Sequence, residues 1–240
     1  MKEKILRIVN ILFVIVQTTF LGFILFSDAD TNNLCFLTVC FGFIHAIPFV
    51  KKEKFNLIYL FGLLFTVISD IFLVLRFSKT GAYSDQTVAM TTFSIAQLCY
   101  GAYLLLAKEN KKVIIIHLTI RIVISLIAVG ATLLVLKENS NYLAVVSLFY
   151  FANLISNVIF AFTEFKKHTL FAIGLVAFLF CDVFIGLNIA EGTFLTFPEN
   201  SFLYKLAHPD FNYAWLFYVI SQTLISLNLA VKVKWKKEKN

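Results

Sequence analysis

Two acidic residues stand inside stretches that are otherwise apolar. Asp70 lies in GLLFTVISDIFLVL (residues 62–75), and Asp182 lies in GLVAFLFCDVFIGL (residues 174–187). A charged carboxylate in the middle of a membrane helix costs about 2.5–3.5 kcal/mol, so an acid kept there normally faces other helices or water. An apolar environment favours the neutral form of a carboxyl group, and a second acid nearby opposes ionisation further. We therefore expect one of the two to be protonated and the other ionised, which suits general acid catalysis beside a stabilising anion.

A structural role is the alternative for these two acids. Each carboxyl group could hydrogen-bond a glutamine, asparagine or serine on a neighbouring helix and only determine how the helices pack. The sequence contains no H-E-x-x-H motif, no glycine-rich phosphate loop and no G-x-S-x-G segment. We therefore predict Asp70 and Asp182 as the catalytic residues, with no metal and no cofactor.

The composition identifies the class of protein that must position these acids. Of 240 residues, 60% are hydrophobic and only 15% are charged, and the polar residues cluster between long apolar runs. A polytopic membrane protein is the class that fits. The net charge of +7 comes from basic residues that flank the apolar runs, so we predict no nucleic-acid partner. The four cysteines fall within apolar segments without metal-ligand spacing and are expected to be buried packing residues.

Eight apolar runs are each close to the roughly 20 residues that a membrane-crossing helix needs. Backbone polar groups find no water in the hydrocarbon layer, so helices are expected, and the alternation typical of a β-barrel is absent. The prediction is an all-α transmembrane bundle forming a single domain over residues 1–240. The predicted spans are 5–26, 34–50, 56–76, 87–107, 113–136, 142–163, 168–187 and 212–232.

The basic residues predict the orientation of the bundle. Eight spans place both termini on one side, and 16 of the 21 Lys and Arg residues flank the spans on that side, against four on the other. Cytoplasmic loops carry such an excess, so both termini are predicted to be cytoplasmic, with the protein in the cell membrane. Arg121 remains, about two turns into the fifth span, and is expected to extend its side chain toward the inner surface.

The two acidic segments also predict an internal repeat. They share a G-L-x6-D-x-F spacing, and the span after each one carries a glutamine, Gln97 or Gln222, ten residues from its predicted start. A four-helix unit used twice keeps its orientation, so the repeat would be parallel. At about 1.5 Å per residue, both acids then lie roughly 8–9 Å below the outer boundary. If the third and seventh helices are neighbours, the acids can face one cavity.

Other polar groups extend the candidate site. Gln97 and Gln222 lie somewhat deeper than the acids, and the i, i+4 spacing of Asn153 and Asn157 puts both on one face of the sixth helix. The longest connection, residues 188–211, is expected on the outer side, as a connector along the membrane interface or as a lid.

These features together resemble the YhhN-type lysoplasmalogenase family. The similarity is carried by the eight spans, G-L-x-F-x-x-x-x-D at Asp70, the second acidic segment at Asp182, and Tyr-x3-Gln from Tyr218 to Gln222. The fourth helix of the family usually contains A-H-x-x-Y, where this chain has Ala96, Gln97 and Tyr100. The resemblance implies a membrane hydrolase that cleaves the vinyl ether bond of lysoplasmalogens to a fatty aldehyde and a glycerophospho-base.

That reaction can be matched to the residues. Hydrolysis begins with protonation of the alkene carbon and continues through an oxocarbenium ion captured by water, which requires an acid and a nearby carboxylate. Asp70 and Asp182 would supply these, and a lysophospholipid-like substrate would contact Gln97, Tyr100, Asn153, Asn157, Tyr218 and Gln222.

Two other interpretations stay open. One is a transporter or lipid-binding bundle whose acids bind protons or cations, although neither acidic segment has a Gly or Pro break around its acid. The other is a catalytically inactive relative.

Overall fold

The computed structural model describes residues 2–27, 29–50, 54–106, 108, 110–137, 140–193, 196–199 and 201–237. Its long helices include eight that are long and apolar enough to cross a membrane, so the predicted helical bundle of an integral multi-pass protein is confirmed. The prediction of the cytoplasmic side remains a prediction. Three of the lysines that contribute to it, Lys51, Lys52 and Lys239, lie outside the described residues.

The eight long helices match the eight predicted spans to within a few residues. In chain order they are α1 (Lys2–Phe26), α2 (Asn32–Ala46, continued by a 3-10 turn over Ile47–Phe49), α3 (Lys54–Asp70), α5 (Tyr83–Leu106), α6 (Lys111–Leu136), α7 (Tyr142–Thr163), α8 (Phe165–Thr193) and α10 (Tyr213–Lys237). Of two short helices, α4 (Ser78–Thr80) ends the third span and α9 (Phe202–Ala207) lies in the connection between α8 and α10.

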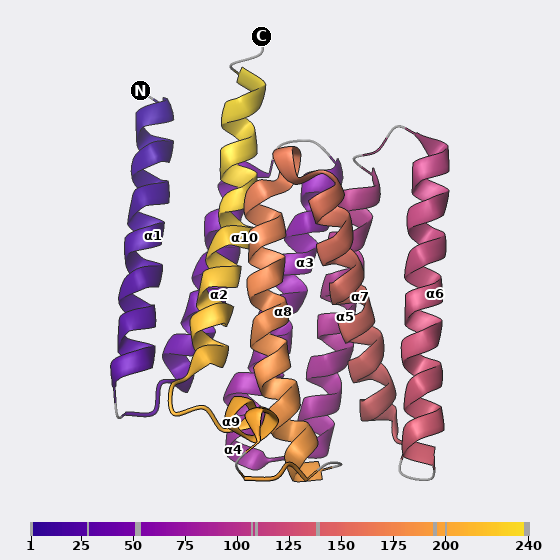
Figure 1. The fold of residues 1–240 in the computed structure, drawn as a ribbon. Coiled ribbons are helices and arrows are strands. Elements are labelled where there is room, and N and C mark those ends of the chain that lie inside the picture. The colour runs from indigo at the N-terminus through magenta and orange to yellow at the C-terminus, as the bar shows by residue number, and fades with distance from the viewer. Residues whose placement is uncertain are drawn as a thin grey trace.

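Both chain ends lie at the same end of the bundle, as an even number of crossings requires (Figure 1). Helices α1 and α6 stand at opposite edges of the bundle in Figure 1. Their membrane-spanning windows are only 17% and 11% buried within the protein, so most of their apolar surface is available to lipid. The interior is formed by α3, α5, α7, α8 and α10, which pack on one another.

The third span is not a regular α-helix throughout. A π-helical segment, Ile71–Phe77, begins directly after Asp70, and α4 follows it before Gly81 ends the span in a left-handed conformation with φ 61°. A π segment shifts the hydrogen-bond register by one residue and requires neither Gly nor Pro. The sequence, which has neither residue here, therefore gave no sign of the irregularity. Such segments occur often at functional sites, and this one starts at the predicted catalytic residue.

Two helix pairs pack as the predicted internal repeat would require. A Cβ added to Gly62 on α3 would lie 2.5 Å from the ring of Tyr100 on α5, and one added to Gly174 on α8 would lie 2.9 Å from the side chain of Ile225 on α10. Tyr100 follows Gln97 by three positions, and Ile225 follows Gln222 by three. Each glycine thus contacts the residue three positions after the glutamine of the next span. The α3–α5 and α8–α10 pairs are therefore aligned in the same way along their lengths.

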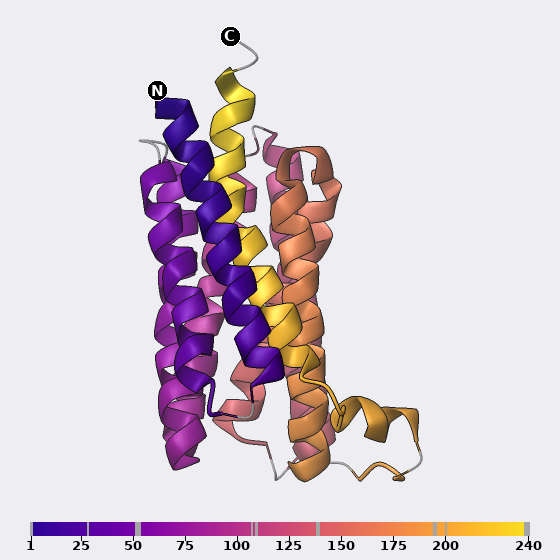
Figure 2. The ribbon, with the colours of Figure 1, turned by 90° about the vertical axis from the view of Figure 1, so that its left-hand side faces the viewer.

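The long connection between α8 and α10 lies at the end of the bundle opposite the termini. Helix α8 continues beyond the predicted span to Thr193, and α9 then stands out to the side of the bundle (Figure 2). Two contacts join the connection to α8. The Asn188 side-chain amide donates a 3.0 Å hydrogen bond to the carbonyl of Ala207, and His208 Nδ1 lies 2.9 Å from a carboxylate oxygen of Glu191.

Candidate active site

Asp70 is sealed inside the bundle. Its residue is 1% exposed, and its Oδ2 atom accepts a 2.5 Å hydrogen bond from the hydroxyl of Tyr218 on α10. Its Oδ1 atom is buried and makes no hydrogen bond among the described residues. Nearly all buried polar atoms in proteins are hydrogen-bonded, so this exception requires an explanation, and a catalytic role is one of those that apply.

Asp182 occupies a more open position on α8. Its side chain is intermediate in burial, and its Oδ2 atom accepts a short hydrogen bond from the hydroxyl of Tyr150 on α7. Tyr150 itself is 5% exposed. The two predicted catalytic acids are therefore arranged alike, each as the acceptor of a buried tyrosine hydroxyl, but they differ in access.

The two acid–tyrosine pairs belong to one cluster. The ring of Phe178 on α8 lies between the pairs, with its centroid 5.5 Å from that of Tyr218 and 6.5 Å from that of Tyr150. The purely structural alternative required each carboxyl group to hydrogen-bond a glutamine, asparagine or serine. In the described part of the chain, neither carboxyl group does so.

Sequence reasoning missed Tyr150, and the repeat explains why. Tyr218 stands four positions before Gln222, and the matching position before Gln97 is Phe93, which has no hydroxyl. The ring of Phe93 instead packs 5.6 Å from that of Tyr150, which supplies the second hydroxyl from α7. The available signal was helical spacing, because Tyr150, Asn153 and Asn157 recur at i, i+3 and i+7 on one face.

Arg121 does not extend to the inner surface, and that expectation was wrong. Its residue is only 8% exposed, and its two terminal nitrogens donate hydrogen bonds of 2.9 and 2.6 Å to the side-chain oxygens of Asn153 and Asn157. The guanidinium group packs against Gly101, where an added Cβ would lie 2.5 Å from it. Two asparagines on one helix face thus bind both terminal nitrogens of the cation inside the bundle, while its Nε atom is buried without a partner among the described residues.

The two predicted glutamines differ in their surroundings. The amide nitrogen of Asn157 donates 2.8 Å hydrogen bonds to both the backbone carbonyl and the side-chain oxygen of Gln97, which ties α5 to the arginine cluster. Within the described residues, Gln222 donates a long 3.4 Å bond to the hydroxyl of Ser221. The Nε2 atom of Gln97 and the Oε1 atom of Gln222 are buried without a hydrogen bond in the described residues. Both amides therefore keep capacity to bind a polar group.

Tyr100 lies farther along the interior. Its hydroxyl is 3.3 Å from that of Thr66, one helical turn before Asp70. Its ring packs against those of Tyr59 and Phe171, with centroids 5.4 and 5.6 Å away. The described residues contain no cluster of three or more His, Cys, Asp or Glu side chains with which a metal ion could be held.

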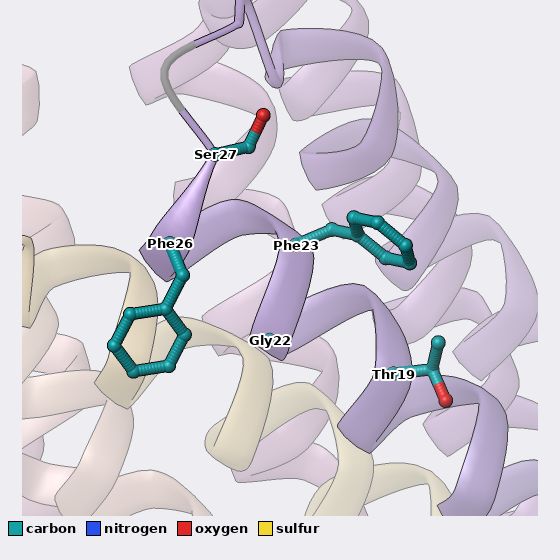
Figure 3. Close-up of a pocket in the computed structure, with 5 residues that line it drawn as sticks. All are labelled: Thr19, Gly22, Phe23, Phe26 and Ser27. Carbon is teal, nitrogen blue, oxygen red and sulfur yellow. The ribbon is translucent and has the colours of Figure 1, made fainter.

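Two surface cavities lie outside this cluster. One, of about 470 Å³, is lined by Thr19, Gly22, Phe23, Phe26 and Ser27 of α1 and its end, and carries no ionisable group (Figure 3). The second, of about 380 Å³, lies between the end of α8 and the segment that leads into α10. Its lining begins at Phe184 and Ile185, two and three residues beyond Asp182, and Phe184 lies on roughly the opposite face of α8 from Asp182.

Comparison with known proteins points to one family. The model of the YhhN family matches residues 33–229, which cover all of the long helices except α1 and the last turns of α10. Searches of curated proteins and of solved structures found no match.

Proposed function

The chain belongs to the YhhN family, and on that premise we propose that it is a membrane-embedded hydrolase of lysoplasmalogens, cleaving the vinyl ether bond to a fatty aldehyde and a glycerophospho-base. The observation that carries the proposal is the cluster of two carboxyl groups, each accepting a hydrogen bond from a buried tyrosine. Vinyl ether hydrolysis needs an acid and an anion, and paired carboxyl groups supply both.

The difference in access supports different roles for the two acids. Asp182 is the more exposed and meets the substrate, whereas Asp70 is sealed behind it. Because the Tyr150 hydroxyl occupies Oδ2 of Asp182, its acidic proton is carried on Oδ1. Asp70 supplies the negative charge that stabilises the cation forming nearby. Its burial opposes that charge, and the hydrogen bond from Tyr218 offsets part of this cost.

Water is the only other reactant that the proposed hydrolysis requires. Asp182 gives its proton to the alkene carbon, and the electron pair of the double bond moves to form an oxocarbenium ion. Water adds to that ion and returns a proton to Asp182, leaving a hemiacetal. The hemiacetal then breaks its bond to the glycerol oxygen, which takes a proton and leaves as the glycerophospho-base, while the fatty aldehyde remains.

An assay on purified protein tests this proposal. Lysoplasmalogens with different head groups are incubated with wild-type protein, and aldehyde is measured. We expect release from wild type and its loss in Asp182→Asn. Absence of aldehyde with every head group would reject the hydrolase. Proton-coupled flux in proteoliposomes that both Asp70→Asn and Asp182→Asn abolish would instead support a transporter.

A further inference from the structure

We propose that the buried cluster around Arg121 binds one chloride ion, with Arg121 Nε and Gln97 Nε2 as its donors. Such a site lies between α5, α6 and α7 and is independent of the proposed hydrolysis. An arginine side chain keeps its positive charge in proteins. Among the described residues, no carboxylate forms an ion pair with Arg121. A buried charge without an opposite charge is costly, so a bound anion would offset that cost.

The unused groups of this cluster are hydrogen-bond donors. Nη1 and Nη2 of Arg121 donate to the side-chain oxygens of Asn153 and Asn157, whereas Nε is buried and has no partner in the described part of the chain. Gln97 Nε2 is buried in the same condition, while Oε1 of the same amide accepts a 2.8 Å bond from Asn157. Two free donors beside occupied oxygens favour an occupant that accepts hydrogen bonds.

The arginine determines which end of each amide faces the free position. The Asn157 oxygen must face Arg121, so its nitrogen faces Gln97, and the Gln97 oxygen must in turn face that nitrogen. The group left over on Gln97 is therefore its nitrogen. Gly101, whose added Cβ would lie 2.5 Å from the guanidinium group, stands one turn after Gln97 on the same face of α5. Both free donors thus belong to one small region of the interior.

A small monovalent anion suits this region better than water or a phosphate group. Water would bring two donor hydrogens of its own to a cluster whose side-chain oxygens, on Asn153, Asn157 and Gln97, already accept. A phosphate group carries several acceptor oxygens and needs more than two donors. Gln97 and Asn157 are 0% exposed, and no residue of the cluster lines either cavity described above. Chloride matches the single positive charge and accepts from any direction.

A chloride ion at this position would hold α6 against the bundle. Only 11% of the membrane-spanning window of α6 is buried, so this helix has little interior contact. Arg121 belongs to α6 and Gln97 to α5, so an ion bound by both joins the two helices. We therefore expect chloride to stabilise the folded protein.

Thermal unfolding in different salts tests the site. Purified protein in detergent is unfolded in mixtures of sodium chloride and sodium gluconate at constant ionic strength, with bromide and inorganic phosphate as separate arms. Above the Kd, the melting temperature should rise by about 3–5 °C for each tenfold increase in chloride. Bromide should act like chloride, and phosphate should not. Calorimetric titration of chloride into protein equilibrated in gluconate should give one site per chain.

Two variants should remove the dependence on chloride. Arg121→Met removes the charge, and Gln97→Glu replaces the free nitrogen by a carboxylate oxygen, so that the chain supplies the anion itself. In gluconate, Gln97→Glu should be at least as stable as wild type. The matched controls are Arg7→Met, at an exposed position on α1, and Gln86→Glu, eleven residues before Gln97 on α5. Both controls should keep the dependence on chloride.

Equal melting temperatures of wild type in chloride and gluconate would overturn the site. Phosphate that stabilises at lower concentrations than chloride would overturn the choice of ion. Dependence on chloride that survives in both Arg121→Met and Gln97→Glu would show that the ion binds elsewhere, and if Arg121→Met does not fold, Gln97→Glu alone decides. Dependence lost in only one of these two variants would remove the other residue from the site.

Discussion

The hydroxyl group of Tyr218 donates a 2.5 Å hydrogen bond to Oδ2 of Asp70, between residues 148 positions apart in the chain. The bond joins α10 to α3 at the point where α3 passes into its π-helical segment. A buried carboxyl group is thus held in one orientation by a partner on another helix. The geometry of the cluster consequently depends on α10 as much as on the helices that carry the acids.

Removal of that hydroxyl should slow the reaction. In Tyr218→Phe the Asp70 carboxyl group loses its observed hydrogen bond while the ring that packs on Phe178 is kept. A hydrogen bond to a charged group contributes about 1.5–3 kcal/mol, so we expect aldehyde release to fall roughly 10- to 100-fold. Tyr142→Phe, at a 58% exposed position on α7, is the matched control and should keep the wild-type rate. An unchanged rate in Tyr218→Phe would show that Asp70 does not need this partner.

The two acids should respond differently to replacement by asparagine. Asp182→Asn removes the group proposed to give its proton to substrate, so aldehyde release should fall by about 10²–10⁴-fold. Asp70→Asn removes only a charge behind it, so we expect a smaller loss. Rates are compared at saturating lysoplasmalogen, with thermal unfolding recorded for both variants. A larger loss in Asp70→Asn than in Asp182→Asn would reverse the two roles.

Loss of the buried cation should destabilise the bundle. Arg121→Met keeps an unbranched apolar stem but removes the guanidinium group, which leaves the side-chain oxygens of Asn153 and Asn157 without these donors. An unsatisfied buried polar group costs about 1–3 kcal/mol, so the melting temperature in detergent should fall clearly. Arg7→Met is the control, because Arg7 is exposed on α1 and a change at an exposed position should alter stability by no more than about 0.5 kcal/mol. Equal melting temperatures for the two variants would contradict this account.

Much of the fold could be predicted because the membrane limits the alternatives. An apolar run of about 20 residues has one stable form there, so the number and approximate bounds of the helices follow from composition. Asp70 and Asp182 could be singled out for the same reason, since acids are rare where they are costly. The family resemblance drew attention to Tyr218 and Gln222, and the structure places Tyr218 on Asp70.

Contacts between helices could not be predicted from one sequence. Arg121 was expected to reach the surface because nothing in the sequence indicates that α7 presents Asn153 and Asn157 to it. Tyr150 was missed because its partner lies on another helix and the repeat has Phe93 at the position of Tyr218. The π-helical segment after Asp70 was missed because its sequence, IFLVLRF, is apolar and compatible with an ordinary α-helix.

The repeat itself makes the sharpest prediction about stability. Gly62→Ala would place a Cβ 2.5 Å from the Tyr100 ring, and Gly174→Ala would place one 2.9 Å from the Ile225 side chain and 3.2 Å from its backbone nitrogen. Because neither helix pair can absorb a methyl group without moving apart, each variant should lose about 1–3 kcal/mol of stability.

Two other glycines of the same helical kind provide the control. Gly22 and Gly130 have nothing within 4 Å of an added Cβ, so their replacement by alanine should be neutral or should stabilise by up to about 1 kcal/mol through helix propensity. Thermal unfolding of the four variants in one detergent measures the difference. If the two pairs of glycines give the same change, the close packing of α3 on α5 and of α8 on α10 does not hold the bundle together. If only Gly62→Ala or only Gly174→Ala is destabilised, the two pairs are not equivalent and the repeat does not extend to their packing.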